Sequence, residues 1–575
     1  MSEPGFKIFR VIFSVFLLIS SAGITAQNAE RGDDILAQVK KTGQADVIIA
    51  YPGYEAMNRL SADFSVSSCN GKQATLTLSP LTDTLFIRLN IPYTLVARDA
   101  SKAVYTASSV KEAMQWHSYP TYRQYDTIMH LLASSYPDLC VLDTLGYSIK
   151  GHAIYALKIS DNTSVEQDKP RVFLTSTIHG DELGGFVMMM RLAEELLTGG
   201  GSDEVVSAIR QGLEVWINPL SNPDGTYNNG DVITSPVRFN SNGVDLNRNF
   251  PGPNVPQSIV VQKENQVMTD FLKKKSFSLS VNFHGGSEVV NYPWDTWSKL
   301  HPDDEWFYDI SRRYADTVHL HSPAGYMTFL DDGVTNGAAW YIIEGGRQDY
   351  VTWALHGREV TIELDNNKET PASDLETLWN SNNRSFLRYI SEALTGIRGY
   401  VTDSVTSLPV RAKVFISGHD ADSSEVYSDA ATGRYNRLIA PGSWNITFTA
   451  NGYMPYTADN VTLTWDQPAR KDVKLKPKTG EAVKTMKIWP VPSTGKIHVR
   501  LPDTFDGNVR FTVTSLSGIV VKTFTWYFSS GVSIPENAEV TDLDGLSAGT
   551  YILKAVDLSD NSSVSGRVVV VKAGN

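Results

Sequence analysis

The order of helical and strand patterns along the chain constrains its fold more than any other feature. Between residues 114 and 395, buried strand-like runs alternate with helical patterns, and after residue 396 the helical patterns disappear. The first arrangement is typical of an α/β sheet flanked by helices. The second, short alternating strands separated by Gly, Pro, Asn and Asp turns, is typical of β-sandwiches. We therefore expect a mixed, twisted α/β sheet domain followed by two all-β sandwich domains.

The same pattern divides the chain into regions. At about 100–200 residues per domain, a chain of 575 residues should hold several domains. The regions that we expect to fold are 27–113, 114–395, 396–478 and 480–575. The first is expected to be β-rich and to serve as an accessory domain or a propeptide, with strands at 46–51 and 84–91. The second should contain a helix at 183–197 and strands at 172–178, 213–218, 278–283 and 360–364.

Residues 1–26 are typical of a signal peptide for export. Lys7 and Arg10 precede an apolar run from Val11 to Ile19, and small residues follow as far as Ala26. The run is too short to span a bilayer, which needs about 20 residues, so an uncleaved membrane anchor is the less favoured alternative. No later segment has the pattern of a transmembrane helix.

Charge and cysteine content narrow the function classes. With 51 Lys and Arg against 63 Asp and Glu, the net charge of −12 argues against nonspecific nucleic-acid binding, which needs a basic face. Two cysteines, Cys69 and Cys140, exclude a disulfide scaffold and a multi-cysteine metal site, although these two could pair after export. A metal ion, if bound, must therefore be held by His and carboxylate side chains.

A candidate metal site begins at His179 and Glu182. They lie three residues apart between a predicted strand and a predicted helix, where two side chains can face one ion. The pair alone is weak, because chance or helix capping by Asp181 explains most such pairs. His284 ends another predicted strand and precedes two glycines that leave room for a substrate backbone, although it could be an ordinary strand-end histidine. Two His, one Glu and an open position make a catalytic zinc arrangement.

Polar loops between these positions supply candidate groups for binding an anion. Arg238, Asn247 and Arg248 lie in or beside the loops at 218–225 and 245–251. A guanidinium binds a carboxylate through two parallel hydrogen bonds, and an amide adds a neutral donor. The alternative for these arginines is an ordinary place in solvated loops.

Several longer motifs then make a family resemblance specific. They occur in the family's order and span about residues 114–395: HxxE from His179, NPDG (222–225), DLNRNFP (245–251), NFHGG (282–286), NYPWD (291–295), GVTNGAAWY (333–341), GGRQDY (345–350) and EVTIEL (359–364). The sequence resembles the zinc metallocarboxypeptidases, in particular the carboxypeptidase N/E branch.

The resemblance implies a role for each catalytic position. His179, Glu182 and His284 would ligate one Zn²⁺ per catalytic domain. Glu363 would act as general base and then as proton donor. Arg238 would polarise the scissile carbonyl and hold the developing oxyanion.

The resemblance also implies how substrate binds. Asn247 and Arg248 would hold the terminal carboxylate of a peptide, and Tyr350 would close over it. Asp295 stands where the branch that cleaves basic residues carries an acid in its specificity pocket, so we expect release of C-terminal Arg or Lys. A simple turn aspartate is the alternative for Asp295.

The two regions after residue 395 resemble known modules as well. Residues 396–478 resemble the transthyretin-like domain that follows the catalytic domain in this branch. Residues 480–575 resemble the C-terminal sorting domain of type IX secretion substrates in Gram-negative bacteria, with an ordinary adhesive sandwich as the alternative. The resemblance implies passage to the cell surface or the medium, and contact with the type IX secretion machinery.

The sequence thus predicts a secreted zinc metallocarboxypeptidase that acts on peptide or protein C-termini. Two alternatives stay open. One is a carboxypeptidase of cell-wall peptides, and the other is a noncatalytic surface-binding protein that uses its β domains. No nucleic-acid partner and no transmembrane segment in the mature chain are expected.

Overall fold

The computed structural model describes residues 28–163, 169–478, 486–494, 496–501, 505, 507–516, 518–528, 539–543, 545–558 and 561–571. The signal peptide expected at 1–26 lies outside these residues. Within the described ranges, no helix has both the length and the apolar composition needed to cross a membrane.

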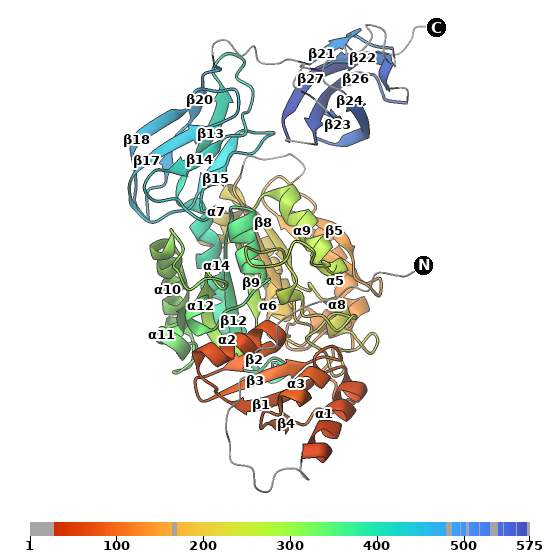
Figure 1. The fold of residues 1–575 in the computed structure, drawn as a ribbon, viewed down its shortest axis with the longest axis vertical. Helices are drawn as coiled ribbons and strands as arrows, with labels where there is room; N and C mark the ends of the chain where they lie inside the picture. Colours follow the sequence, from red (N-terminus) through yellow and green to blue (C-terminus); the bar gives the residue numbers. More distant parts are fainter. Residues whose placement is uncertain are drawn as a thin grey trace, which may run out of the picture.

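An eight-stranded mixed sheet forms the centre of the molecule (Figure 1). Its strand order is β11-β10-β12-β9-β7-β8-β6-β5. The strands are β5 (Cys140–Tyr147), β6 (Ala153–Ile159), β7 (Arg171–Ser176), β8 (Glu214–Asn218), β9 (Leu279–His284), β10 (Ser287–Tyr292), β11 (Val334–Asn336) and β12 (Arg358–Asp365). Strands β8, β7, β9 and β12 run parallel to their neighbours in this series, so their carboxyl ends meet at one edge. The four strands expected in this region are confirmed, with ends that differ by one or two residues.

Helices cover both faces of this sheet. Side chains of consecutive strand residues point to opposite faces, so one strand contributes to two separate cores. Val172 and Leu174 of β7 belong to one hydrophobic core, and Phe173 between them belongs to a second. The first core contains residues of α5 (Tyr122–Ser135), α6 (Gly184–Thr198), α7 (Glu204–Gly212), α10 (Asp304–His321) and α14 (Leu375–Ser391). The second is formed with α9 (Lys263–Lys275) and the turn Tyr350–Ala354. The helix expected at 183–197 corresponds to α6, which is almost wholly buried.

The N-terminal region is a separate small unit with a four-stranded sheet and three helices. The sheet has the order β2-β3-β1-β4. Its elements are α1 (Asn28–Thr42), β1 (Ala45–Ala50), α2 (Tyr54–Asp63), β2 (Ser65–Cys69), β3 (Gln73–Leu78), α3 (Asp83–Leu89) and β4 (Thr94–Val96). The strand expected at 84–91 is wrong, because this segment is α3, which buries Asp83 and Phe86 three residues apart on one side of a helical turn. The region is therefore mixed in structure and less dominated by strands than its sequence suggests.

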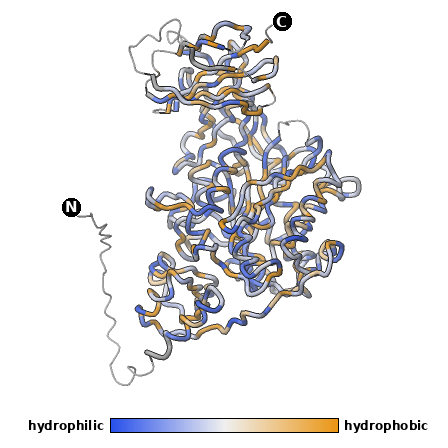
Figure 2. The backbone as a smooth tube through the Cα atoms, turned by 90° about the vertical axis from the view of Figure 1, so that its right-hand side faces the viewer, coloured by the Kyte–Doolittle hydropathy of each residue, from blue (hydrophilic) through white to orange (hydrophobic). Residues whose placement is uncertain are grey.

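The chain after residue 396 forms only strands among the described residues, as expected. The first unit contains two sheets around one core, with strands β13 (Ile397–Asp403), β14 (Lys413–Ile416), β15 (Val426–Tyr427), β16 (Arg434–Arg437), β17 (Gly442–Thr449), β18 (Tyr456–Leu463), β19 (Ala469–Arg470) and β20 (Val473–Leu475). The second contains β21 (Lys487–Trp489), β22 (Lys496–Arg500), β23 (Gly507–Ser515), β24 (Val520–Phe528), β25 (Glu539–Asp542), β26 (Gly549–Asp557) and β27 (Ser563–Val570). Buried residues alternate with more exposed ones along β26, as a sandwich with one solvated face per sheet requires. Figure 2 shows hydrophobic and hydrophilic residues interspersed along the chain.

A buried ion cluster fixes the first β unit to the α/β unit. Arg437 at the end of β16 donates to both carboxylate oxygens of Asp303, each at 2.9 Å, and to Asp420 at 2.6 Å. Arg358, the first residue of β12, donates to the same Asp303 at 2.7 Å. Burial raises the pKa of Asp303, but the two guanidinium charges outweigh it and hold that pKa below its ordinary value. Loss of one partner from such a cluster costs about 3–5 kcal/mol, so the β unit is firmly joined to the strand that carries Glu363.

The two cysteines do not pair. Cys69 ends β2 and Cys140 begins β5, and both are buried as free thiols. Burial raises the pKa of each thiol, which keeps them protonated and unreactive. The pairing that the sequence left open is therefore absent.

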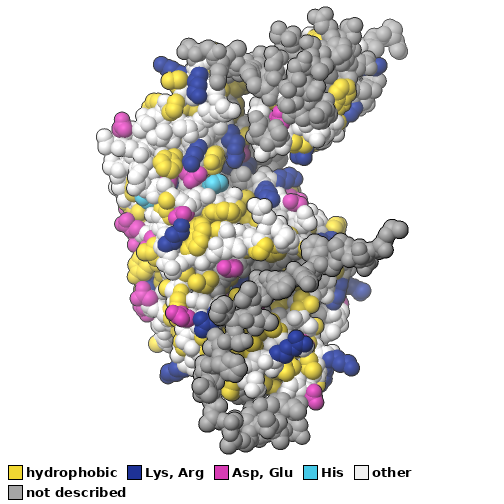
Figure 3. Space-filling view, viewed as in Figure 1, with side chains coloured by type: hydrophobic (Ala, Val, Ile, Leu, Met, Phe, Trp, Pro, Cys, Tyr) yellow, Lys and Arg dark blue, Asp and Glu magenta, His cyan; other side chains and the backbone are white. Residues whose placement is uncertain are grey.

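The face of the molecule seen in Figure 3 carries side chains of both charges. On the face seen in Figure 3, Lys and Arg side chains are interspersed with Asp and Glu, without a large area of one sign. Among the described residues of this face, no large area of one charge marks a docking surface.

Candidate active site

The candidate catalytic residues meet because parallel strands end at the same edge of the sheet. His284 is the last residue of β9, and Glu363 on the neighbouring strand β12 lies directly opposite it. The loop that carries His179 and Glu182 leaves the end of β7, the strand on the other side of β9. Three adjacent parallel strands thus deliver all four side chains to one place.

His179, Glu182 and His284 form a compact, buried cluster. Nδ1 of His179 lies 2.8 Å from Glu182 Oε1, Nδ1 of His284 lies 2.8 Å from Glu182 Oε2, and the two Nδ1 atoms are 3.1 Å apart. One ligand atom from each residue lies within 4.8 Å of the others. Two imidazole nitrogens and a carboxylate oxygen are the donor types that Zn²⁺ takes in catalytic sites. The residues present therefore fit a zinc ion.

Neighbouring side chains orient both histidines from behind. The Asp245 carboxylate lies 3.1 Å from Nε2 of His179, and the Asn282 side-chain amide lies 2.7 Å from Nε2 of His284. Each contact occupies the ring nitrogen that faces away from the cluster and leaves Nδ1 to face the ion. The sequence prediction did not include Asp245, although its place at the start of the DLNRNFP motif was a signal for it.

Glu363 is buried beside the metal-ligating cluster. Its Oε2 atom has no hydrogen-bond partner in the described part of the chain. In the metal-free structure, burial and then the negative charge of Glu182 raise the pKa of Glu363 to about 8. A carboxylate with a raised pKa is suited to accept a proton and return it near neutral pH.

Arg238 and Arg248 both line the pocket, but they differ in how many of their N–H groups have hydrogen-bond partners. Arg238 donates from Nε to Asp245 at 3.0 Å and from Nη1 to Glu182 at 3.2 Å. Arg248 donates from Nη1 to the Asn247 carbonyl at 3.0 Å, while its Nε and Nη2 are buried without partners. These two groups form one edge of the guanidinium, the edge that binds a carboxylate through two parallel hydrogen bonds. The backbone N–H of Arg347 donates to Asn247 Oδ1 at 2.9 Å and fixes that amide nearby.

Tyr350 is not brought to this site. It lies in the second core of the sheet, 1% exposed, with its ring 5.5 Å from that of Phe250, and it does not line the pocket. Tyr341 lines the pocket instead. Burial raises the pKa of Tyr341, while the charge of Arg248 lowers it and that of Glu363 raises it further. The expectation for Tyr350 is therefore replaced by Tyr341, the last residue of the GVTNGAAWY motif.

Asp295 lines the same pocket and is 3% exposed. The Asn291 amide donates to its Oδ1 atom at 3.0 Å. Burial, and then the nearby negative charge of Asp349, raise the pKa of Asp295 well above its ordinary value. Within the described chain no Lys or Arg forms an ion pair with this carboxylate, so the pocket holds an acid without a cationic partner.

The N-terminal unit lies directly over this pocket. Val66 and Ser67 of its edge strand β2 line the pocket together with the zinc-site residues. The free space that they leave is about 20 Å³, which is room for about one water molecule. No amino-acid side chain fits while β2 is in this position.

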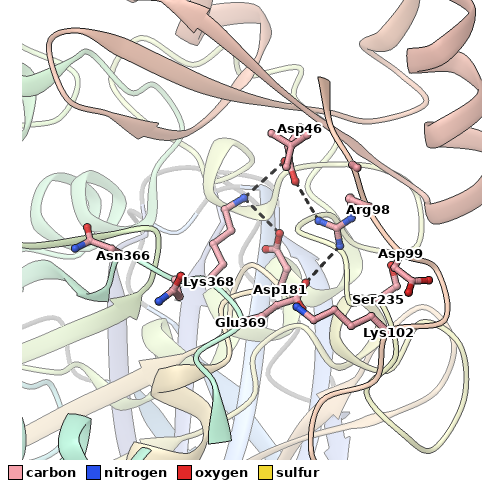
Figure 4. A pocket seen from close by; sticks show the side chains of 12 residues that line it. Asp46, Arg98, Asp99, Lys102, Asp181, Ser235, Asn366, Lys368 and Glu369 are labelled. Atoms are coloured by element: carbon pink, nitrogen blue, oxygen red, sulfur yellow. Dashed lines mark hydrogen bonds and ion pairs between the residues drawn. The ribbon is translucent and has the colours of Figure 1, made fainter. Parts of the chain in front are cut away.

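Polar contacts anchor this unit to the catalytic loops. Gln44 accepts from the backbone N–H of Arg238 at 2.7 Å and donates to Asp181 at 3.1 Å, and Ser65 donates to Asp245 at 2.6 Å. Figure 4 shows a second group of contacts, in which Lys368 reaches between Asp181 and Asp46 of the N-terminal unit.

Comparison with known proteins agrees with this geometry. Residues 125–385 match the family described as zinc carboxypeptidase, residues 396–476 match a carboxypeptidase regulatory-like domain, and residues 487–571 match a secretion system C-terminal sorting domain. The chain is 30% identical over 405 residues to the carboxypeptidase N catalytic chain of Rattus norvegicus. The matched segment covers 62% of this chain and 86% of that protein. The chain belongs to the zinc carboxypeptidase family.

Other similar proteins are matched over very different shares of their own length. Carboxypeptidase D of Homo sapiens is 32% identical over 404 residues, which is 64% of this chain and 29% of that protein. The chain thus spans less than a third of the length of that relative. Among solved structures, carboxypeptidase A from Helicoverpa armigera is 17% identical with a TM-score of 0.49, and the match covers 62% of this chain and 99% of that one.

Proposed function

We propose that the chain is a secreted zinc metallocarboxypeptidase that hydrolyses the last peptide bond of a peptide or protein. The observation that carries the proposal is Arg248, whose Nε and Nη2 are buried without partners at the pocket that also holds the zinc-site residues. A free C-terminal carboxylate satisfies both groups at once, whereas an internal peptide bond offers no such anion. This requirement limits the enzyme to chain ends.

The reaction follows from the positions of the chain's own side chains. His179, Glu182 and His284 would hold a zinc ion, which would supply Lewis acidity and lower the pKa of bound water. Glu363 takes the proton of the attacking water and passes it to the leaving amine. Arg238 donates to the oxyanion that develops on the carbonyl, a contact whose loss typically costs about 10²–10³ in rate.

Asn247, Arg248 and Tyr341 complete the substrate site in this proposal. Asn247 and Arg248 bind the terminal carboxylate, as proposed from the sequence. Tyr341 takes the covering role that the sequence assigned to Tyr350, since Tyr341 is the tyrosine that lines the pocket.

Asp295 supports a preference for basic C-terminal residues. A buried carboxylate without a cationic partner favours a Lys or Arg side chain and rejects an acidic one. The Asp295→Ala variant should therefore lose about 30-fold or more in kcat/KM on peptides ending in Arg or Lys and keep its zinc content. An unchanged ranking of peptides ending in Arg, Lys, Leu and Glu would refute this role for Asp295.

The N-terminal unit is proposed to be a propeptide that keeps the enzyme latent. Its strand β2 fills the mouth of the pocket, and Gln44 and Ser65 bind the loops that carry Arg238 and Asp245. Substrate can enter only after this unit moves away. The exposed loop at residues 99–102 is a suitable point at which to separate it.

The function is tested with the full chain carrying a site-specific protease sequence in the loop at 99–102. If less than about 10% of intact molecules have an open pocket, cleavage there should raise kcat/KM at least about 10-fold. Peptides ending in Arg, Lys, Phe and Glu and a cell-wall peptide serve as substrates, with the Gln44→Ala and Ser65→Ala variants as an independent way to loosen the contact between the N-terminal unit and the catalytic loops.

Preferential cleavage of the wall peptide would favour the cell-wall alternative, and no cleavage of any substrate would favour the noncatalytic one. An intact chain as active as the cleaved chain would contradict the propeptide proposal.

The last unit is proposed to direct the enzyme out of the cell. Its match to a secretion system sorting domain supports passage through the type IX secretion machinery, after export by the signal peptide predicted at 1–26. Deletion of residues 480–575 should hold the protein in the periplasm of a host with that machinery, measured by cell fractionation. Continued delivery to the surface or the medium would contradict the sorting role.

A further inference from the structure

The lining of the pocket offers a second acceptor beside Asp295. Asn291 lies on β10 opposite Thr361 of β12, is 4% exposed, and lines the pocket. Its Nδ2 donates to Asp295 Oδ1 at 3.0 Å, and its Oδ1 has no hydrogen-bond partner in the described chain. An unpartnered buried amide oxygen loses free energy, so a site that contains one is suited to a ligand that donates to it.

The orientation of the Asn291 amide is set by Asp295. When Asp295 is ionised, as pairing with a cationic ligand requires, rotation of the amide by half a turn would put two acceptor oxygens 3.0 Å apart with no proton between them. Nδ2 therefore faces Asp295, and Oδ1 faces away from it. The amide oxygen and the carboxylate therefore lie side by side in the pocket lining, where both can accept hydrogen bonds from one ligand group.

The glycine at position 337 lets the backbone lie close against these two acceptors. A Cβ at Gly337 would collide with Asp295 Oδ1 and lie 2.7 Å from Asn291 Oδ1. Both oxygens therefore lie beside the same backbone position, where any larger residue would displace them. A Cβ at Gly346 would lie 3.7 Å from the other carboxylate oxygen, Asp295 Oδ2.

We infer that Asn291 is a second specificity-determining residue, which makes the pocket select a C-terminal arginine over a C-terminal lysine. This inference rests on the proposed function. A guanidinium has five N–H donors in a planar fork, so it can donate to the Asp295 carboxylate and to Asn291 Oδ1 at the same time. An ammonium is a compact, strongly hydrated point charge, and it gives up more hydration on entering so small a space. One hydrogen bond to a charged group corresponds to a preference of roughly 10- to 100-fold.

The test compares kcat/KM for peptides that differ only in a last residue of Arg, Lys or Leu. It uses the full chain cleaved in the loop at 99–102 and loaded with zinc. We expect Asn291→Leu, which keeps the side-chain volume without the acceptor, to lower the Arg-to-Lys ratio about 10-fold. Asp295→Asn should lower both rates together. Asn380→Leu, an exposed change on α14, is the matched control and should leave the ratio unchanged.

The outcomes separate this inference from the proposed function. If no peptide is cleaved by the wild-type chain, the proposed function fails and the inference with it. If Arg and Lys peptides are cleaved and Asn291→Leu leaves their ratio unchanged, the inference fails and the proposed function stands. Zinc content and the midpoint of thermal unfolding identify a variant that does not fold, in which case Asn291→Ala gives the same comparison with a smaller side chain.

Discussion

Removal of the metal is expected to abolish peptidase activity completely and reversibly. Without zinc, the water that attacks the peptide bond keeps a pKa near 15.7, far above any value that Glu363 can match, and Arg238 alone is left to hold the oxyanion. Dialysis of the chain, cleaved in the loop at 99–102, against a chelator should leave no measurable cleavage, and stoichiometric Zn²⁺ should restore it. The same zinc should raise the midpoint of thermal unfolding, because an ion at 100 times its dissociation constant stabilises the folded state by about 2.7 kcal/mol.

Two histidine variants make this experiment specific. His284→Ala should remove both the zinc content and the zinc-dependent rise in the unfolding midpoint, since one of three ligands is lost. His130→Ala changes an exposed histidine on α5 and should alter neither. Activity that survives removal of all bound metal would refute the zinc mechanism.

Glu363→Gln is expected to lower kcat by about 10²–10⁴ while the chain keeps its zinc. Glutamine has nearly the same shape but cannot accept a proton. Glu363 lies beside the metal-ligating cluster and is not one of its three members, so metal content should not change. Glu305→Gln, an exposed change on α10, is the matched control and should keep full activity. A Glu363→Gln enzyme with wild-type kcat would refute the role of Glu363.

The pH profile gives an independent check on Glu363. As a base it works only when ionised, so activity should rise as pH rises through its pKa and fall in acid. Burial and the charge of Glu182 raise the pKa of Glu363 to about 8 without metal, and a bound cation favours the ionised form and lowers that value. The acid limb of wild-type kcat/KM should therefore lie below pH 8 and be absent from the residual activity of Glu363→Gln. The same acid limb in both enzymes would assign it to another group.

Much of the candidate site could be predicted from the sequence because its residues lie in short motifs at the ends of strands. His284 ends β9 and Glu363 lies on β12, and both strands are apolar runs whose pattern is visible without a structure. Parallel pairing then brings such strand ends together. The metal cluster thus follows from local pattern and from the family's motifs.

The error over Tyr350 has a physical explanation. Both Tyr350 and Tyr341 lie in motifs of the family, and sequence position does not reveal the direction in which a side chain points. Tyr350 is in a helical turn whose buried side faces the second core, against Phe250. Tyr341 follows the short helix Gly337–Trp340 and faces the pocket. The misplaced strand at 84–91 has a similar origin, because Ile and Phe favour strands locally and packing of Phe86 into the N-terminal core favours the helix.

The sequence by itself determined the change from α/β to all-β structure, and it indicated the His, Glu and His residues that form the buried cluster. These depend on periodicity and motifs within a few residues of one another. Only the tertiary structure decided that β2 fills the mouth of the pocket, that Asn291 stands beside Asp295 with a free acceptor, and that Arg437 binds Asp303. These contacts join residues that are far apart in the chain or depend on the direction of a single side chain. They arise when whole units pack against each other, and no local pattern encodes the outcome of that packing.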